Sequence, residues 1–233
     1  MTPEERDIEE KAFAFIKANA ALLRTKFADP AKYKSVERPV SLFMAGSPGA
    51  GKTEVSKSLV KKFQSAPIRI DADEIRTLCP GYTGSNAHLF QKAANKGVNI
   101  LFDYALHHSI SCILDGTFAY GGAVENIRRS IDKGRVVELW FIYQDPLKAW
   151  EFTKAREAKE TRRVSKEVFV ESFFEAKRNV RKVKTQFYTV ELNLLIKDYG
   201  TSREDFWLNI NADELDRYIH DGYTEDTLQR LLI

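Results

Sequence analysis

The sequence has only two cysteines, Cys79 and Cys112, among its 233 residues. Two cysteines are too few for the disulfide framework of a small secreted domain, and Cys112 lies in an apolar run typical of a buried core. No apolar run approaches the ~20 residues of a membrane-spanning helix, and the acidic, polar start does not resemble a signal peptide. From these absences we expect a cytoplasmic protein with no membrane partner.

The chain also has little net charge, +3 at pH 7. So small an excess does not suggest a nucleic-acid coat, and we do not expect a nucleic-acid partner. Hydrophobic residues make up 43% and charged residues 30% of the sequence, values that are ordinary for a globular protein.

Short apolar runs alternate with longer stretches of helical spacing. Strands are expected at 40–45, 67–71, 111–114, 136–143 and 192–196, and 206–210 either forms a sixth strand or pairs with the fifth as a hairpin. Helices are expected at 54–63, 85–107, 121–133 and within 147–188. The alternation predicts an α/β fold, a parallel sheet with helices on both faces.

An amphipathic helix is expected before the first strand, over residues 3–27, followed by a polar connector up to residue 39. It begins with a capping box, in which Thr2 and Glu5 satisfy each other's backbone groups. The helix is either a brace that packs on the core or a segment that binds a partner or covers the site.

A glycine-rich loop follows the first strand. It reads Gly-Ser-Pro-Gly-Ala-Gly-Lys-Thr and matches Gly-x-x-x-x-Gly-Lys-Ser/Thr without a mismatch, between an expected strand and an expected helix. Glycines let backbone N–H groups close around phosphate oxygens, and the next helix points its N-terminus at the same anion. The predicted nucleotide-binding residues are Gly46, Ser47, Pro48, Gly49, Ala50, Gly51, Lys52 and Thr53.

Within this loop, Lys52 is expected to reach the β- and γ-phosphates, and the Thr53 hydroxyl to bind Mg²⁺. ATP and Mg²⁺ are therefore the expected cofactors. The alternative is a glycine-rich turn that binds nothing.

Acidic residues follow the second and third strands, whose carboxyl ends lie at one edge of a parallel sheet. Asp71 and Asp73 are both candidates for the base that accepts the proton of a hydroxyl group. We expect only one of the two to face the nucleotide. The alternative for Asp73 is the cap of a helix starting near Glu74. Asp115 and Thr117 are candidates for contacting a sugar or a hydrated metal, or form a plain turn.

Residues 151–184 contain eleven Lys and Arg but only six Glu. Arginines stabilise the charge of a γ-phosphoryl group in transfer, so a cationic lid over ATP is one interpretation. The other is an ordinary solvated helix face.

The ordered set of motifs resembles the zeta toxins, the kinase components of bacterial toxin–antitoxin pairs. The motifs are 46–53, Ile-Asp-Ala-Asp-Glu-Ile-Arg (70–76), Leu-Asp-Gly-Thr (114–117), Asp-Pro (145–146), Arg156 and Arg-Arg-Val-Ser-Lys-Glu (162–167). The likeness runs from about Val40 to Asn179. It divides the chain into an N-terminal helix and connector, 1–39, and a P-loop kinase domain, 40–233, with a lid at about 147–188.

The resemblance implies an ATP- and Mg²⁺-dependent kinase that phosphorylates UDP-N-acetylglucosamine on a sugar hydroxyl, with an antitoxin protein as a partner. By position, Asp73 is the base, Lys52 the phosphate lysine and Thr53 the magnesium ligand. Asp115 and Thr117 fall where the family contacts the sugar. Arg156 and Arg163 fall where it places two γ-phosphate arginines, and Arg162 is an adjacent rival.

Three departures from the family concern the acceptor. Where the zeta toxins carry Glu-Gly-Thr-x-Arg, this chain has Asp115 in place of the glutamate and Ala119 in place of the arginine. A further substrate-side Glu has no match, and Asp103 is the nearest acid. A kinase of a different sugar, nucleoside or polynucleotide hydroxyl, and a nucleotide-dependent interaction module, are the alternative functions.

Overall fold

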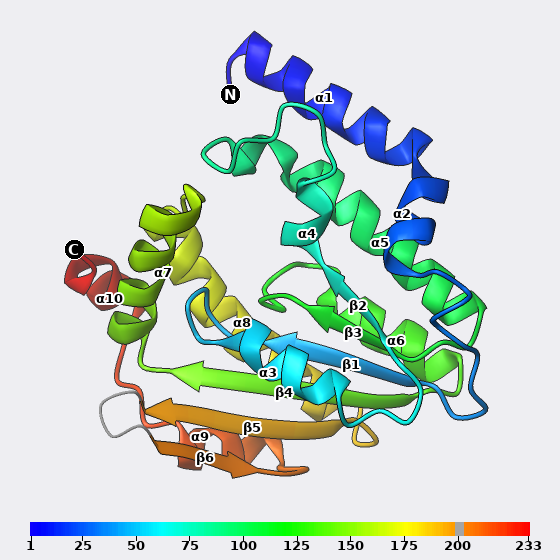
Figure 1. Cartoon of the computed structure of the whole chain (residues 1–233). Helices are drawn as coiled ribbons and strands as arrows, with labels where there is room; N and C mark the ends of the chain where they lie inside the picture. The colour runs from blue at the N-terminus through cyan, green and yellow to red at the C-terminus, as the bar shows by residue number, and fades with distance from the viewer. Residues whose placement is uncertain (199–202) are drawn as a thin grey trace.

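The computed structural model describes residues 1–198 and 203–233, and a six-stranded sheet lies at its centre (Figure 1). The strands are β1 (Val40–Ala45), β2 (Ile68–Asp71), β3 (Cys112–Asp115), β4 (Val136–Gln144), β5 (Glu191–Asp198) and β6 (Arg203–Trp207). They are ordered β2-β3-β1-β4-β5-β6. The first five are parallel and β6 is antiparallel to β5, as the hairpin alternative predicts.

Helices cover both faces of this sheet, which confirms the predicted fold class (Figure 1). They are α1 (Pro3–Ala18), α2 (Ala20–Phe27), α3 (Lys52–Val60), α4 (Ala72–Arg76), α5 (Gln91–His107), α6 (Ala123–Asp132), α7 (Pro146–Glu160), α8 (Lys166–Gln186), α9 (Ala212–Tyr218) and α10 (Glu225–Leu231), with a 3₁₀ turn, η1 (Ala87–Phe90). Across the two described ranges, no helix has the length and apolar character that crossing a membrane would require.

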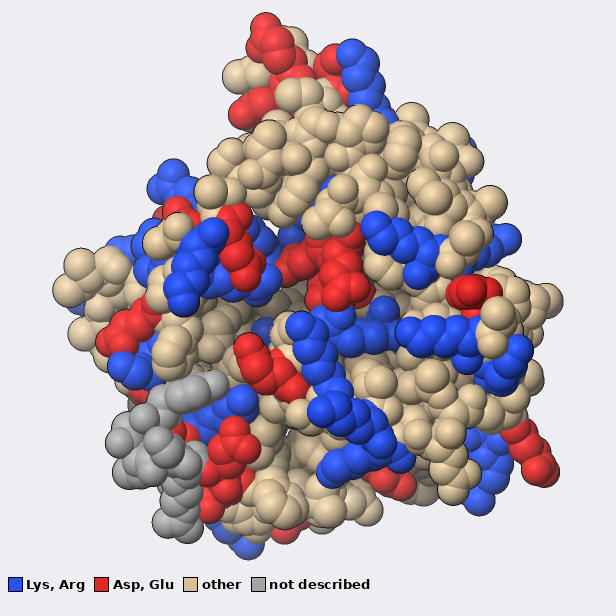
Figure 2. Space-filling view, viewed as in Figure 1, with Lys and Arg blue, Asp and Glu red and all other residues tan. Residues whose placement is uncertain are grey.

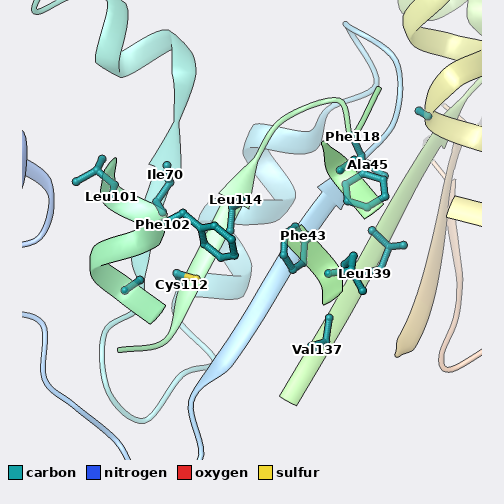
Figure 3. Close-up of a cluster of buried hydrophobic side chains, with 14 of the residues drawn as sticks. Phe43, Ala45, Ile70, Leu101, Phe102, Cys112, Leu114, Phe118, Val137 and Leu139 are labelled. Atoms are coloured by element: carbon teal, nitrogen blue, oxygen red, sulfur yellow. The ribbon is translucent and has the colours of Figure 1, made fainter. Parts of the chain in front are cut away.

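The central strand β1 is buried on both sides. Leu42 and Met44 pack toward α3, whereas Phe43 packs into the larger core on the opposite face, which α5, α6 and α8 cover. The Phe43 ring meets the edges of Phe102 and Phe118 at centroid distances of 6.0 and 5.9 Å (Figure 3). Burial on both faces explains why β1 reads as a continuous apolar run, and it fixes the strand end from which the glycine loop leaves.

The N-terminal segment forms two helices rather than the single one predicted over 3–27. Asn19 interrupts it with a backbone conformation of φ −104° and ψ 32°, and its side-chain amide donates to the Phe15 carbonyl at 2.8 Å. Asn19 thus caps the end of α1 at Ala18, and α2 begins at the next residue, Ala20. Ile16 and Leu23 are fully buried in the larger core, as the brace alternative expects. The division of the chain at residue 39 stays a prediction.

The expected lid contains α7 and α8, joined by residues 161–165. At its base, Trp150 and Phe169 pack with Leu228 and Leu232 from the C-terminal segment. The Trp150 indole N–H also donates to the backbone oxygen of Ile233 at 2.8 Å. The base of the lid is therefore anchored by α10 (Figure 1).

Candidate active site

The glycine loop leaves β1 with three glycines at positive φ: Gly46 at 137°, Gly49 at 76° and Gly51 at 83°. Side chains rarely adopt such angles, and two of these positions also have no room for one. A Cβ on Gly46 would lie 2.3 Å from the Ile142 carbonyl oxygen of β4, and one on Gly49 2.0 Å from the Ala149 carbonyl oxygen of α7. Glycine is therefore required both for the curvature of the loop and for its close packing.

The loop ends at the first turn of α3, with Gly51 as the N-cap and Lys52 and Thr53 as the first two helical residues. The ammonium group of Lys52 donates to the Ser47 carbonyl at 2.7 Å, so it folds back over the loop. Burial lowers the pKa of Lys52 to about 8, although the nearby Asp115 and Asp73 carboxylates act in the opposite direction. Ser47 and Ala50 are buried, whereas Pro48 and Thr53 are half-buried.

Asp71 ends β2 and caps α4, since its Oδ1 accepts from the Asp73 backbone N–H at 2.8 Å. The alternative in which Asp73 caps a helix starting near Glu74 is therefore wrong, because α4 starts at Ala72. The segment also does not stay extended past Asp71, because Asp73 already lies in the first turn of α4.

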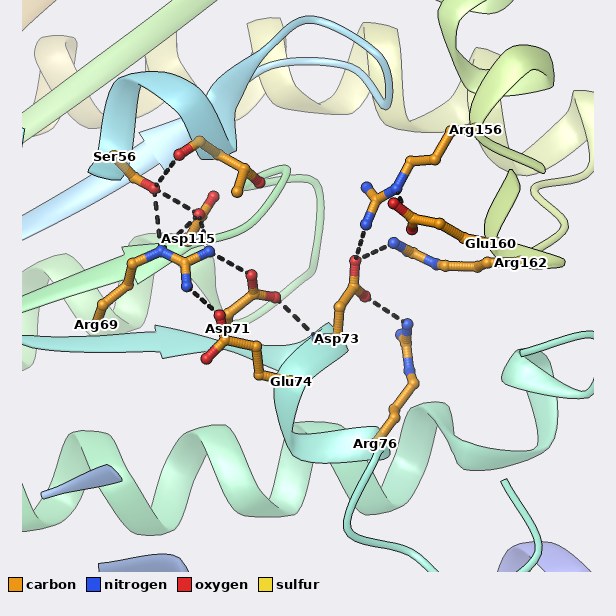
Figure 4. Close-up of polar contacts among 11 residues, drawn as sticks. Ser56, Arg69, Asp71, Asp73, Glu74, Arg76, Asp115, Arg156, Glu160 and Arg162 are labelled. Atoms are coloured by element: carbon orange, nitrogen blue, oxygen red, sulfur yellow. Dashed lines mark hydrogen bonds and ion pairs between the residues drawn. The ribbon is translucent and has the colours of Figure 1, made fainter. Parts of the chain in front are cut away.

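The side chain of Asp73 faces the lid (Figure 4). Its Oδ2 lies 3.5 Å from Arg156 Nη2 and accepts a shorter contact from Arg162 Nη1. Its Oδ1 accepts from Arg76 Nη1 at 2.7 Å. One carboxylate therefore meets three guanidinium groups, two of them from a segment more than eighty residues away in the sequence.

The structure brings Arg162, rather than Arg163, to Asp73. Thr161 adopts a left-handed conformation, with φ 58°, at the end of α7, and the chain turns there. The Arg162 side chain is 24% exposed, whereas that of Arg163 is 75% exposed and lies 4.0 Å from Glu157. Of the two predicted lid arginines, Arg156 thus contacts Asp73 and Arg163 does not. The second contact from the lid comes from Arg162.

Asp115, at the end of β3, is only 8% exposed and is already occupied by protein contacts. Its Oδ2 accepts from Ser56 Oγ at 2.6 Å and from Arg69 Nη2 at 2.8 Å (Figure 4). Arg69 also donates to Asp71 at 2.5 Å. Burial and the neighbouring carboxylates of Asp73 and Asp115 raise the pKa of Asp71 to about 6.

Thr117 connects two predicted parts of the site, because its carbonyl oxygen accepts from the Gly46 N–H at 3.1 Å. The turn after β3 is thereby tied to the glycine loop. Asp103, in contrast, is 60% exposed and its ion pair is with Arg129 of α6. The roles of Asp115 and Thr117 toward a sugar stay predictions.

Sequence reasoning missed three residues that hold the acidic groups: Ser56, Arg69 and Arg76. An arginine between two buried isoleucines in a strand, as Arg69 is, was the available signal, since a charge in such a position needs a carboxylate partner. Nothing comparable marks Ser56, whose partner is 59 residues away.

Figure 2 shows acidic residues at the centre of this face, flanked by Lys and Arg on either side. A glycine-rich loop with a lysine, a carboxylate in the helix that follows β2, and guanidinium groups from a helical lid form an arrangement that can bind a nucleotide and neutralise its phosphates. The fold and this arrangement define a P-loop protein of the kinase-like class.

Comparison with protein families gives the particular family. The family model described as zeta toxin matches residues 24–210, which is most of the chain. The chain therefore belongs to the zeta toxin family, whose members are kinase-like phosphotransferases. The resemblance read from the motifs is confirmed.

Solved structures agree on the fold. A chain from the PezAT chromosomal toxin–antitoxin system of Streptococcus pneumoniae is 19% identical, with a TM-score of 0.68 over 99% of this chain and 93% of that one. A chain of the AvrRxo1-ORF1:ORF2 complex solved with ATP is 16% identical, with a TM-score of 0.62 over 96% of this chain and 74% of that one. A chain of the same complex solved with sulphate ions is 16% identical, with a TM-score of 0.61 over 95% of this chain and 74% of that one. No curated protein matches the sequence.

Proposed function

We propose that this protein is an ATP- and Mg²⁺-dependent kinase that transfers the γ-phosphate to a hydroxyl group of a small molecule. The observation that carries the proposal is the convergence of Arg156 and Arg162 on Asp73 beside the glycine loop. Membership of the zeta toxin family and a structural neighbour solved with ATP support it. A structural ion-pair cluster alone would not need a phosphate-binding loop next to it.

In the proposed reaction, loop N–H groups and Lys52 hold the β- and γ-phosphates. The acceptor oxygen bonds to the γ-phosphorus, its proton passes to Asp73, and the bond to the β-phosphate oxygen breaks as ADP leaves. Arg156 and Arg162, which face Asp73 here, are placed to turn to the γ-phosphoryl oxygens, where charge accumulates during transfer.

The residues present are compatible with Mg²⁺. Among the described residues no three His, Cys, Asp or Glu gather in a way that could hold a metal by themselves. Mg²⁺ does not require such a cage, since it keeps several waters and binds through one or two protein oxygens and the substrate phosphates. Thr53, at the start of α3, would supply the hydroxyl ligand, and the ion would neutralise phosphate charge.

UDP-N-acetylglucosamine is the first candidate acceptor, by family resemblance. Two observations favour a different hydroxyl compound as the second candidate. Ala119 stands where the family's substrate arginine is expected. In addition, Asp115 Oδ2 is held by Ser56 and Arg69, so a sugar would have to displace or share these contacts.

The proposed partner is an antitoxin protein. Structural neighbours come from a toxin–antitoxin system and from a two-protein complex. If a wild-type gene expressed alone slows bacterial growth and the Lys52→Ala gene does not, the toxin proposal is supported; equal growth of the two strains would contradict it.

The kinase proposal is tested by a transfer screen. Wild type, Asp73→Ala and the control Asp132→Ala, an exposed acid of α6, are incubated with γ-labelled ATP and Mg²⁺. Acceptors are UDP-N-acetylglucosamine, other sugar nucleotides, nucleosides and a metabolite extract, with products identified by mass spectrometry. We expect Asp73→Ala to lose transfer by about 10²–10⁴-fold while binding ATP normally.

Two results would contradict the proposal. If Asp73→Ala transferred phosphate as well as Asp132→Ala, the assigned base would be wrong. If wild type labelled no acceptor, water included, the nucleotide-dependent interaction module would become the better explanation.

A further inference from the structure

The two oxygens of the Asp73 carboxylate have different surroundings. Oδ1 accepts from Arg76 Nη1 at 2.7 Å, whereas Oδ2 meets the lid arginines. The Arg76 side chain is only 4% exposed, compared with 46% for Arg156. One oxygen is therefore held by a buried cation of the same short helix, and the other faces the more open side of the site (Figure 4).

Arg76 is in turn held from the first turn of α5. Its Nη2 donates a short hydrogen bond to Gln91 Oε1, and Gln91 Nε2 donates to Asn95 Oδ1 at 2.8 Å. The helices α4 and α5 are packed closely here, since a Cβ on Gly97 would lie 2.6 Å from Ile75 Cγ2. A chain of polar contacts thus runs from α5 through the guanidinium to the carboxylate.

The Asp73 carboxylate offsets the cost of burying the charge of Arg76. Burial lowers the pKa of Arg76, and the Asp73 charge acts against that change. Within the described ranges, Arg76 Nε is buried without any hydrogen-bond partner, so the guanidinium is not optimally solvated by protein. A cation placed there at such a cost holds its carboxylate partner tightly, because Arg76 without Asp73 would be a buried charge without its ion-pair partner.

We propose that Arg76 is a positioning residue for phosphoryl transfer, which fixes Oδ1 of Asp73 so that Oδ2 is the oxygen that accepts the hydroxyl proton. The proposal rests on the proposed kinase function and deepens it. Arg76 touches no reacting atom in this scheme and acts through Asp73 alone. Gln91 supports it by fixing the guanidinium plane.

The test compares Arg76→Gln, Arg76→Lys and Gln91→Leu with wild type. Arg128→Gln serves as the control, because that arginine is 55% exposed on α6 and its ion pair is with Glu125 of the same helix. For each variant, kcat and the KM for ATP are measured from pH 5 to 9, with the acceptor found in the screen or with water. Thermal unfolding is measured on the same samples.

We expect Arg76→Gln to lose about 10–100-fold in kcat with an unchanged KM for ATP. Arg76→Lys keeps the charge but not the contact with Gln91, so kcat should recover in part. Arg128→Gln should match wild type.

Gln91→Leu keeps the test decisive if the Arg76 variants fail to fold, since Gln91 is exposed. We expect it to fold normally and to lose at least ~3-fold in kcat with no change in KM. A wild-type kcat in Gln91→Leu, or in a folded Arg76→Gln, would overturn the positioning role. Failure of the kinase function is a separate result, because wild type itself would then release no γ-phosphate.

Discussion

The glycine loop and the Asp73 cluster lie at neighbouring strand ends but are held in place by different means. The loop is fixed by its own backbone: positive φ at Gly46, Gly49 and Gly51, and close approaches to the carbonyls of β4 and α7. The Asp73 cluster is fixed by ion pairs between side chains of α4 and the lid. The first is specified within eight consecutive residues, the second only when distant segments meet.

This difference implies different failure modes. A change in the loop alters local geometry and should damage both ATP binding and stability. A change in a lid arginine of the cluster should leave the fold intact but remove charge from the proposed place of phosphoryl transfer. The following predictions test that separation.

The largest effect is expected in the lid. Arg162→Ala should lower phosphoryl transfer by about 10³-fold, because it removes a guanidinium that lies beside Asp73. Arg163→Ala, which changes the neighbouring 75% exposed side chain, should change the rate by less than ~3-fold. Single-turnover kinetics of both variants check this, with melting temperatures as the control for folding. A larger loss in Arg163→Ala would mean that the lid rearranges and that Arg163 is the second phosphate arginine.

An intermediate effect is expected in the loop. Gly49→Ala places a Cβ 2.0 Å from the Ala149 carbonyl oxygen at a φ of 76°, and should cost about 2–4 kcal/mol of unfolding free energy. ATP binding should be lost with it. Gly121→Ala is the matched control, because nothing lies within 4 Å of its added Cβ. Denaturant unfolding and calorimetric titration measure the two effects; an intact ATP affinity in Gly49→Ala would contradict the assignment of the loop.

The smallest effect is a pH dependence that only the loop should show. Lys52 has a pKa of about 8 in the free protein, and bound phosphates would raise it, so ATP binds best when Lys52 is protonated. Affinity should be level below pH 8 and fall by at most about tenfold per pH unit above it. Titration calorimetry from pH 6.5 to 9.5 measures this. Lys52→Arg, which stays charged, should give a level profile; a parallel decline in that variant would assign the effect to another group.

Much of the fold could be predicted because each element carries its own signal. The apolar run of β1 and the glycine pattern after it are local signals. Once the strands are predicted, the rule that ligands bind at the carboxyl ends of parallel strands brings Asp73 and Asp115 to one edge of the sheet. The break at Asn19 could not be predicted, because one side-chain amide decides it against an otherwise continuous helical pattern.

The details of the site were less predictable because they depend on contacts distant in sequence. Arg69 reaches Asp115 across 46 residues, and no periodicity encodes such a pair. The choice of Arg162 over Arg163 depends on positive φ at Thr161, a conformation that a threonine rarely adopts and that composition does not reveal. The start of α4 at Ala72 likewise followed from which of two aspartates supplied the cap.

The packing of α10 against the lid has a consequence for the proposed capture of ATP. Because Trp150 and Phe169 are held by Leu228 and Leu232, α7 and α8 are already assembled at their base before any ligand arrives. A free-swinging arm would lose conformational entropy in every capture event, whereas this chain loses most of it once, when it folds. For the proposed kinase we therefore expect closure to involve the Arg156 side chain and the stretch carrying Arg162, and not the motion of a whole helical hairpin.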